Sequence, residues 1–531
     1  MNFSRAITVW SEQRPEQTAI RFEGGSITYR ELEGRIVAAT AELSALGIRP
    51  GQRVAYLGLN HPVMLVLLFA LCRLGAIFQP LNFRLSATEH ARQLLDSTPS
   101  LFFHADEYRA HLEDVAAQAP LPAVTDAEAL WESTGHATAT GQPTATGIPP
   151  PAGDPQSPTP QPGSLNDDAL LVYTSGTSGE PKGVLLTQEA LLFNCINSIH
   201  AHDLTPADHG LIVLPLFHVG GLNIMLLPLL YVGASVTLHR RFDPALLLRD
   251  ITLLRPTLLL MVPATISAAI AEPGWEQADL SSLRMINTGS SVVPLSLIEA
   301  WHARGIPVGQ VYGSTETCPI AIYLRAEDAT RKAGSAGRAA MHCEVDLVDG
   351  AGTAVAAGVT GEIRVRGPSV MRGYFGRPEA TAAAIQDGWY RTGDLARQDE
   401  DGFFWVVGRS KDMIVSGGEN IYPAELEAVL ADSPAIAEAA VVGVPDERWG
   451  EVPVAVVIRR SPDSIDETGV AALFEGRLAR YKRPKRIVFV DDLPRTALGK
   501  VQKSVLAARL GESAGAADTG PVKTSTSSGA A

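Results

Sequence analysis

Short runs of apolar and β-branched residues recur along this chain and alternate with longer segments of helical periodicity. The clearest runs are ALLVYT (169–174), GLIVLPL (210–216), PTLLLMVP (256–263) and RMINTG (284–289). Strands that alternate with helices are typical of α/β units, in which most strands are parallel and buried on both faces. The pattern therefore predicts a large α/β domain with parallel-type sheets layered with helices.

The pattern changes after Val359, where short strands surround turns. These strands are expected at GEIRVRG (361–367), GFFWVVGR (402–409) and KDMIVSGG (411–418), and the helix-like PAELEAVLADS (423–433) follows them. Short strands mixed with helices indicate a small α+β unit. We divide the chain into an N-terminal domain at 1–409 and a C-terminal domain at 410–510.

Two segments show no sustained hydrophobic period. The segment 120–162 is rich in Pro, Thr, Ala and Gly, and the segment 511–531 consists mostly of small and polar residues. Such compositions bury too little apolar surface to offset the entropy of ordering the chain. We predict a disordered surface insertion at 120–162 and a disordered tail at 511–531.

The chain shows no signal for export or for membrane insertion. Its most apolar runs, Val63–Cys72 and Ile224–Val232, are about half the ~20 residues that a membrane helix needs, which leaves only a peripheral membrane contact open. The start lacks the charged-then-apolar layout of a signal peptide, and the four cysteines form no CxxC pair. We expect a cytoplasmic protein with reduced thiols.

Net charge narrows the choice of partners. The formal net charge of −14 argues against binding to nucleic acid, because proteins that bind a phosphate backbone usually carry a basic excess. An anionic ligand must therefore meet a local group of cations and N–H donors. These features do not specify an oligomeric state, and a homodimer stays open.

One segment has the composition of a phosphate-binding loop. In YTSGTSGEPKGVLLT (173–187) an apolar strand runs into a loop of Ser, Thr and Gly, and a lysine follows. Glycines let backbone N–H groups approach phosphate oxygens, hydroxyls donate hydrogen bonds, and the lysine adds a positive charge. The loop does not fit the Walker motif GxxxxGK[ST], the Rossmann fingerprint GxGxxG or the serine-hydrolase motif GxSxG. The candidate ligands of the phosphates are Thr174, Ser175, Gly176, Thr177, Ser178, Gly179 and Lys182.

Taken whole, this loop resembles the signature of the adenylate-forming superfamily, which includes acyl-CoA synthetases, peptide-synthetase adenylation domains and luciferases. Similar blocks follow in the family's order at LPLFHVGG (214–221), NTGSSVVP (287–294), VYGSTET (311–317), GEIRVRGPSVMRGYF (361–375), YRTGDLARQDEDGFFWVVGR (390–409), SGGENIYPAELE (416–427) and LPRTALGK (493–500). The resemblance covers nearly everything except the insertion and the tail. It implies a small C-terminal domain that rotates on a hinge at Lys411.

The resemblance also implies an activity. It indicates an ATP-dependent carboxylic acid:CoA ligase, in which acid and ATP give acyl-AMP and pyrophosphate, and acyl-AMP and CoA then give acyl-CoA and AMP. The implied cofactors are ATP, Mg²⁺ and coenzyme A. Three alternatives stay open. A stand-alone adenylation enzyme would load a carrier protein, and a luciferase-like oxygenase would share the adenylation step. A non-catalytic nucleotide-binding scaffold would be expected to have lost Lys182, Glu316, Asp394 or Lys500, and all four are present.

Roles in the adenylation step follow from matching positions in these blocks. Glu316, together with Thr174, would hold Mg²⁺, and Thr315 would contact the α-phosphate. Tyr312 would stack on adenine, and Asp394 would accept hydrogen bonds from both ribose hydroxyls. The neighbouring nucleotide-binding positions are Gly289, Ser290, Ser291, Gly313 and Arg409. Lys500 would be the catalytic lysine, which stabilises the charge that develops during adenylation.

Two further sets of residues would serve the thiol and the acid. Gly417 and Gly418 match the glycines of the pantetheine channel, and His218 would line the acyl pocket. The pocket segments HVGGLN, NTGSSV and GSTETCPIA contain no Arg or Lys that could receive a second carboxylate. The predicted substrate is therefore a hydrophobic monocarboxylate, with fatty and hydroxycinnamic acids both open.

Overall fold

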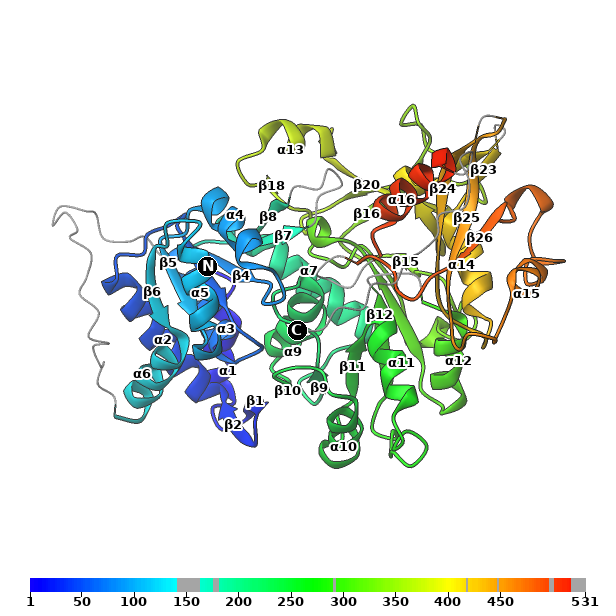
Figure 1. Cartoon of the computed structure of the whole chain (residues 1–531). Helices are drawn as coiled ribbons and strands as arrows, with labels where there is room; N and C mark the ends of the chain where they lie inside the picture. The colour runs from blue at the N-terminus through cyan, green and yellow to red at the C-terminus, as the bar shows by residue number, and fades with distance from the viewer. Residues whose placement is uncertain are drawn as a thin grey trace, which may run out of the picture. The chain divides into compact units, whose positions relative to one another are not determined.

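The computed structural model describes residues 1–140, 163–174, 181–289, 293–416, 419–446, 448–495 and 501–516. The chain forms two compact units, Met1–Val406 and Val407–Ala531 (Figure 1). The predicted boundary after Arg409 stays a prediction.

The first unit contains a seven-stranded sheet over its described residues, in the order β18-β8-β7-β4-β3-β5-β6. Its strands are β3 (Arg53–Leu57), β4 (Ile77–Leu81), β5 (Leu101–His104), β6 (Ala123–Asp126), β7 (Asp168–Thr174), β8 (Lys182–Thr187) and β18 (Gly373–Tyr374). The strands from β7 to β6 are parallel, whereas β8 and β18 join antiparallel at the β7 edge. This edge carries the segment that resembles a phosphate loop.

A nine-stranded sheet forms the other half of this unit, in the order β15-β14-β13-β12-β11-β9-β10-β1-β2. Its strands are β1 (Thr18–Phe22), β2 (Gly25–Thr28), β9 (His209–Ile212), β10 (Ser235–Leu238), β11 (Leu258–Met261), β12 (Met285–Gly289), β13 (Val308–Tyr312), β14 (Ile322–Leu324) and β15 (Arg338–Ala339). From β13 to β1 every neighbouring pair is parallel. The prediction of parallel-type sheets layered with helices is confirmed.

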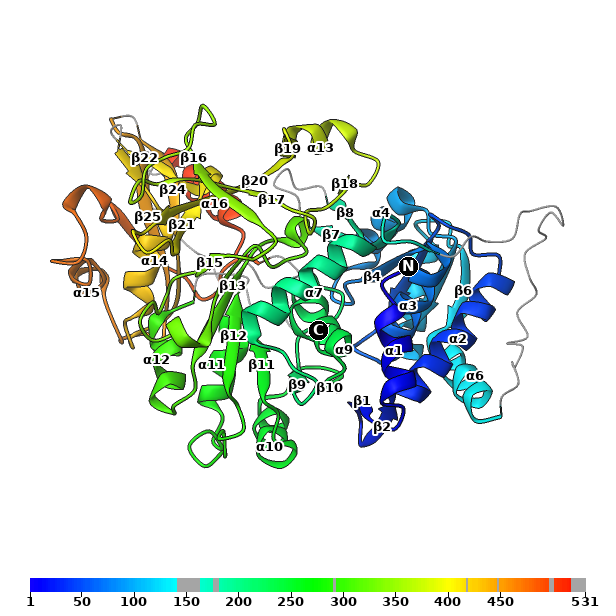
Figure 2. The ribbon, with the colours of Figure 1, turned by 180° about the vertical axis from the view of Figure 1, so that it is seen from behind.

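Helices cover both sheets and separate them. The helices of the first unit are α1 (Arg5–Gln13), α2 (Tyr29–Ala45), α3 (Val63–Leu74), α4 (Ala87–Ser97), α5 (Arg109–Ala116), α6 (Ala127–Thr140), α7 (Gln188–His202), α8 (Val219–Gly221), α9 (Leu227–Val232), α10 (Pro244–Leu254), α11 (Pro263–Ala271), α12 (Leu295–Ala303) and α13 (Pro378–Ala384). In both ribbon views α7 and α9 lie between the two sheets (Figure 1, Figure 2), where α7 contacts β7 and β8 and α9 contacts β10. Their apolar residues join both sheets into one core.

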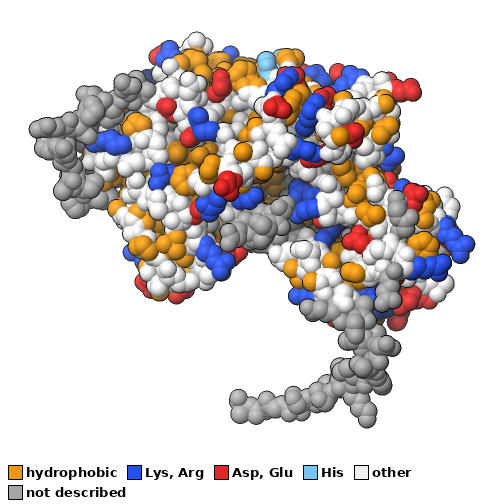
Figure 3. Space-filling model, turned by 90° about the horizontal axis from the view of Figure 1, so that it is seen from above, with side chains coloured by type: hydrophobic (Ala, Val, Ile, Leu, Met, Phe, Trp, Pro, Cys, Tyr) orange, Lys and Arg blue, Asp and Glu red, His pale blue; other side chains and the backbone are white. Residues whose placement is uncertain are grey.

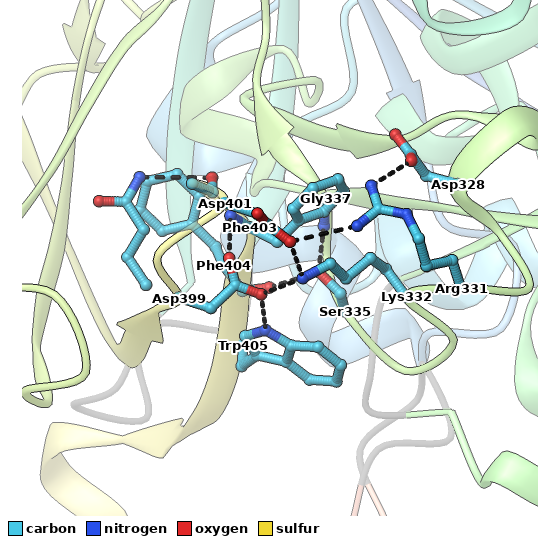
Figure 4. A network of polar contacts seen from close by, with 12 residues as sticks. Asp328, Arg331, Lys332, Ser335, Gly337, Asp399, Asp401, Phe403, Phe404 and Trp405 are labelled. Atoms are coloured by element: carbon cyan, nitrogen blue, oxygen red, sulfur yellow. Dashed lines mark hydrogen bonds and ion pairs between the residues drawn. The ribbon is translucent and has the colours of Figure 1, made fainter.

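A smaller antiparallel sheet lies at the end of the first unit, and its last strand continues past Val406 into the second unit. It contains β16 (Glu344–Val348), β17 (Gly361–Arg366), β19 (Ile385–Gln386), β20 (Trp389–Gln398) and β21 (Phe404–Arg409). The turn from β20 to β21 is held by Lys332, whose Nζ lies 2.8 Å from Asp399 Oδ2 and 2.7 Å from Asp401 Oδ2 (Figure 4). Trp405 Nε1 donates a further hydrogen bond to Asp399. This network fixes the strand that leads out of the unit.

The prediction of disorder over 120–162 is wrong for its first half. Residues 123–126 form β6, which pairs with β5, and 127–140 form α6. Ala127 and Leu130 are buried, and the Arg35 guanidinium stacks 3.6 Å from the Trp131 ring. A few buried apolar residues order this segment despite its biased composition. Residues 141–162 lie outside the described part.

The second unit has its own sheet and core. The sheet runs β23 (Glu419–Ile421), β22 (Ile414–Ser416), β25 (Gly450–Arg459), β24 (Ile436–Asp446), with β26 (Arg486–Phe489) on β25. The helices are α14 (Pro423–Ala431), α15 (Glu467–Ala472) and α16 (Lys503–Ala516). Because α16 continues to Ala516, the predicted tail does not begin at 511, and 517–531 lie outside the described part.

Two further observations concern hydrophobic helix length and surface charge. No helix among the described residues is long and apolar enough to cross a membrane. On the face in Figure 3, Lys and Arg side chains are interspersed with Asp and Glu, and the described atoms of this face form no continuous basic surface. This mixture is unlike the basic stripe of a nucleic-acid-binding face.

Candidate functional site

The segment predicted to bind phosphate lies between two paired strands. Thr174 ends β7, Lys182 begins β8, and the two residues are register partners. Thr174 Oγ1 donates a hydrogen bond to the Lys182 carbonyl over 3.5 Å. The predicted phosphate ligands between them, Ser175, Gly176, Thr177, Ser178 and Gly179, lie outside the described part. The strand pairing thus places a lysine at the foot of the loop.

Lys182 and the predicted metal ligand Glu316 both contact the same tyrosine, Tyr374. Lys182 Nζ lies 4.9 Å from the centroid of the Tyr374 ring, and Tyr374 Oη donates a hydrogen bond to Glu316 Oε1 over 3.0 Å. Glu316 belongs to the short 3₁₀ turn Thr315–Thr317 after β13, and its carbonyl accepts from the Met371 N–H at 2.8 Å. Segments far apart in the sequence therefore bring a cation and a carboxylate to one place.

The predicted adenine and ribose ligands form a second pair. Tyr312, the last residue of β13, donates from Oη to Asp394 Oδ2 over 2.8 Å. Asp394 lies in β20, and its N–H donates to Thr392 Oγ1 at 3.0 Å. Burial, and next the Asp394 charge, raise the pKa of Tyr312 well above its usual value, so this phenol remains a hydrogen-bond donor. Tyr312 and Asp394 are therefore coupled.

Two glycines of the predicted site make close backbone contacts. A Cβ atom on Gly289 would lie 2.4 Å from the Val311 carbonyl oxygen, and one on Gly313 would lie 1.7 Å from the Pro319 carbonyl oxygen. Any side chain there would displace backbone. These glycines allow β12, β13 and the Glu316 turn to approach one another. Ser290 and Ser291 lie outside the described part.

His218 stands at the start of an irregular helix. It precedes α8, which continues into a π-helical turn at Leu222–Leu226, a form often found at functional sites. The His218 ring lies 4.4 Å from the Phe217 ring, which in turn packs edge-on against Phe83 at 5.2 Å. A Cβ atom on Gly220 would meet nothing within 4 Å. The surroundings are aromatic and leave open space at Gly220.

The remaining predicted residues belong to the second unit. Arg409 ends β21, and Lys411 lies in the 3₁₀ turn Ser410–Asp412; both are exposed. Gly417, Gly418 and Lys500 lie outside the described part. In the first unit, the contacts described above therefore join Lys182 to Glu316 through Tyr374, and Tyr312 to Asp394.

The donor atoms suit a magnesium nucleotide. The described residues hold no group of three or more His, Cys, Asp and Glu side chains that could bind a metal ion by themselves. Glu316 offers a carboxylate and Thr174 a hydroxyl, which are the hard oxygen donors that Mg²⁺ accepts. Mg²⁺ commonly takes one or two carboxylates and completes its shell with substrate phosphates and water. The site therefore fits Mg²⁺ that arrives with ATP.

The sequence analysis missed one residue of this site. Tyr374 lies inside the block GEIRVRGPSVMRGYF, yet nothing in that block distinguishes it from a packing aromatic. Its contact with Glu316 depends on the pairing of β18 with β8, which no local pattern encodes. The only feature of the sequence that could have identified Tyr374 as a site residue is its position next to Gly373 within a block that resembles the family.

The chain is similar to known proteins over most of its length. Residues 7–375 match the family described as AMP-binding enzyme, and residues 425–500 match the C-terminal domain of that enzyme. The chain is 49% identical over 513 residues to an indoleacetate–CoA ligase from Aromatoleum aromaticum, across 95% of this chain and 97% of that protein. It is 43% identical over 497 residues to a feruloyl-CoA synthase from an Amycolatopsis species, across 94% and 96% respectively.

Its fold is also similar to solved structures. The structure of o-succinylbenzoate CoA synthetase from Bacillus subtilis, in complex with its acyl-adenylate intermediate, superposes with a TM-score of 0.83 at 33% identity, over 94% of this chain and 97% of that one. A second structure of that enzyme, in complex with ATP and magnesium ion, gives a TM-score of 0.82 at 32% identity, over 94% and 98% respectively.

Proposed function

Since the chain belongs to the AMP-binding enzyme family, we propose that this ATP-dependent carboxylic acid:CoA ligase acts on an aromatic monocarboxylic acid of the indolylacetic or hydroxycinnamic class. The 49% identity to an indoleacetate–CoA ligase, over nearly the full length of both chains, carries this proposal. The feruloyl-CoA synthase supports the same class. Phe217 and the open space at Gly220 suit a flat ring better than a charged or strongly polar group.

The ligase reaction has two steps. A carboxylate oxygen of the acid attacks the α-phosphorus of ATP, the bond to the β-phosphate breaks, and pyrophosphate leaves with the electron pair. The thiol of CoA then attacks the acyl carbonyl of acyl-AMP, loses its proton, and AMP leaves. The first step brings two anions together, so it needs neutralised charge and aligned reactants.

We assign the phosphate end of ATP to the cluster around Lys182. Glu316 and Thr174 would hold Mg²⁺, which when bound neutralises phosphate charge and orients the leaving pyrophosphate. Lys182 would supply a second positive charge to the phosphates, and Thr315 would donate to the α-phosphate. The 4.9 Å contact of Lys182 with the Tyr374 ring, beside Glu316, supports this arrangement.

We assign the nucleoside end to Tyr312 and Asp394. The Asp394 carboxylate would accept from the ribose hydroxyls, while Tyr312, which is held by that carboxylate, would present its ring to adenine. By their family positions, Arg409 and Lys500 would contact phosphate or ribose oxygens and the developing charge. Gly417 and Gly418 would leave room for pantetheine, and Lys411 would be the hinge.

We further propose that the enzyme works in the cytoplasm. All four cysteines, Cys72, Cys195, Cys318 and Cys343, are free and buried. A chain that keeps four free thiols and forms no disulfide among its described residues is typical of a reducing compartment. Fractionation of the native source would test this assignment, and recovery of the enzyme outside the cytoplasm would contradict it.

The experiment for the proposed function is AMP release from Mg·ATP with a panel of acids, each with and without CoA. We expect CoA-dependent release to be fastest with indole-3-acetate or hydroxycinnamates and slow with fatty acids of similar length. Lys500→Ala should abolish release, whereas exposed Arg14→Ala is the matched control and should retain it. A higher kcat/KM for fatty acids would contradict the aromatic assignment. Pyrophosphate release that CoA leaves unchanged would point to a carrier protein as acceptor.

A further inference from the structure

Tyr374 occupies a position between two opposite charges. The Lys182 ammonium lies over the face of its ring at 4.9 Å, and the Glu316 carboxylate accepts its hydroxyl proton at 3.0 Å. Among the described contacts, Lys182 and Glu316 do not form an ion pair with each other. One side chain therefore contacts both groups that the proposed function assigns to the phosphates and the metal.

The backbone holds Tyr374 in this position from two sides. Tyr374 pairs with Val184 across β18 and β8, and the Phe375 N–H donates to the Gly183 carbonyl at 2.7 Å. On the other side the Tyr374 N–H donates to Thr381 Oγ1 at 2.9 Å. Because β8 begins with Lys182, the strand that carries the lysine also positions the tyrosine. The ring is thus fixed before any ligand binds.

A direct ion pair between Lys182 and Glu316 would compete with substrate. Opposite charges in a partly buried site attract strongly, and a closed pair would neutralise the groups that phosphate and metal need. An aromatic ring holds an ammonium group without neutralising it, and a phenol hydrogen bond orients a carboxylate without removing its charge.

We propose that Tyr374 is a positioning residue that orients Glu316 toward the magnesium of Mg·ATP and keeps Lys182 separate from that carboxylate. The inference rests on the proposed role of Glu316 as the metal ligand. It assigns to a tyrosine hydroxyl the orienting hydrogen bond that metal-binding carboxylates usually receive from a neighbouring group. The two parts of the side chain act on different ligands: the hydroxyl on the metal, the ring on the lysine.

The roles of the hydroxyl and of the ring can be separated by calorimetric titration. One titration uses Mg·ATP and the other uses metal-free ATP in the presence of a chelator, both without acid or CoA. Tyr374→Phe removes only the hydroxyl. We therefore expect Mg·ATP binding to weaken about tenfold, as it does when a group that orients a metal ligand is lost, while the affinity for metal-free ATP changes less than about twofold. Tyr374→Leu also removes the ring, and it should weaken metal-free ATP binding as well. Equal effects of Tyr374→Phe on both ligands, or no effect, would overturn the proposal.

Two control variants distinguish a failure of the role proposed for Tyr374 from a failure of the metal-ligand role proposed for Glu316. Glu316→Gln should show the same selective loss of Mg·ATP binding; if it does and Tyr374→Phe does not, only the role of Tyr374 fails. If Glu316→Gln binds Mg·ATP normally, the assignment of Glu316 is wrong. Tyr29→Phe loses a buried hydroxyl that donates to the Ala234 carbonyl at 2.7 Å, far from the site. It reports the effect of losing a tyrosine hydroxyl on stability and should bind Mg·ATP normally.

Discussion

At the residue scale, the bond between Tyr312 and Asp394 couples the two predicted nucleoside ligands. Asp394 is only 9% exposed, and a charged acceptor at such a site contributes more than a neutral one. Asp394→Asn should therefore raise the KM for ATP by about 10- to 100-fold, since hydrogen bonds to charged groups contribute about 1.5–3 kcal/mol. The KM for the acid should change little. Steady-state kinetics with each substrate varied would measure both constants.

Tyr312→Phe is the matched variant, because it keeps the ring and removes only the hydrogen bond to Asp394. We expect a smaller rise in the KM for ATP, about fivefold, in line with roughly 1 kcal/mol for an ordinary hydrogen bond. If Tyr312→Phe and Asp394→Asn have equal effects, the carboxylate serves only to orient the tyrosine, and its assignment to the ribose is wrong.

Adjacent glycines near His218 differ in the space around them. A Cβ atom on Gly221 would lie 2.2 Å from the Pro215 carbonyl oxygen, whereas one on Gly220 would meet nothing within 4 Å. Gly221→Ala should lower the free energy of unfolding by about 1–3 kcal/mol, because backbone must move, and Gly220→Ala should change it by less than about 0.5 kcal/mol. Urea unfolding would measure both variants. Equal decreases in the free energy of unfolding for the two variants would show that the backbone at Pro215 moves without a measurable cost.

At the element scale, the turn between β20 and β21 depends on one lysine. Lys332 pairs with Asp399 and Asp401 (Figure 4), and although burial alone would raise the pKa of Asp399, hydrogen bonds from Lys332, from the Phe403 N–H and from Trp405 lower it to about 2. Lys332→Met should lower the free energy of unfolding of the first unit at pH 7.

The pH dependence of that loss tests its cause. The folded pKa of Asp399 lies below the unfolded value, so its contribution is present above about pH 4 and disappears as the pH falls through about 2. The difference between wild type and Lys332→Met should accordingly shrink on acidification toward pH 2. Arg109→Met, which removes an exposed pair with Asp106, is the control and should lower the free energy of unfolding less than Lys332→Met does. A constant difference at every pH would indicate lost packing instead.

Elements differed in how far the sequence could predict them. The buried strands β7, β9, β11 and β12 were predictable because each coincides with a short apolar run in the sequence. The helix α6 was not, because AEALWESTGHATAT hides its few buried residues among Ala and Thr, and its order depends on packing against α2 and on β6 pairing with β5. Lys182, Glu316 and Asp394 could be singled out because their blocks resemble a family, whereas Tyr374 required the fold.

At the scale of the whole molecule, histidines are distributed unevenly. All twelve lie at or before His342, within the first unit, and burial lowers the pKa of His61, His90, His202 and His209 to about 4. An unfolded histidine has a pKa near 6.5, so between about pH 6.5 and 4 the unfolded first unit binds more protons than the folded one. The contribution of these neutral histidines to the free energy of unfolding of the first unit is therefore complete above pH 6.5 and falls on acidification. The second unit contains no histidine and lacks this contribution.

Tryptophan fluorescence can follow the first unit alone. Trp449 is the only tryptophan after Val406, so in Trp449→Phe every remaining tryptophan reports the first unit. We expect the urea midpoint of this variant to fall steadily from pH 7 to pH 5, a range in which most carboxylates stay ionised. His90→Gln should lower the midpoint at pH 7 but flatten its slope with pH, because one buried neutral imidazole is gone. A midpoint that is constant from pH 7 to 5 would mean that these histidines take up protons equally in the folded and unfolded protein, so that burial does not lower their pKa.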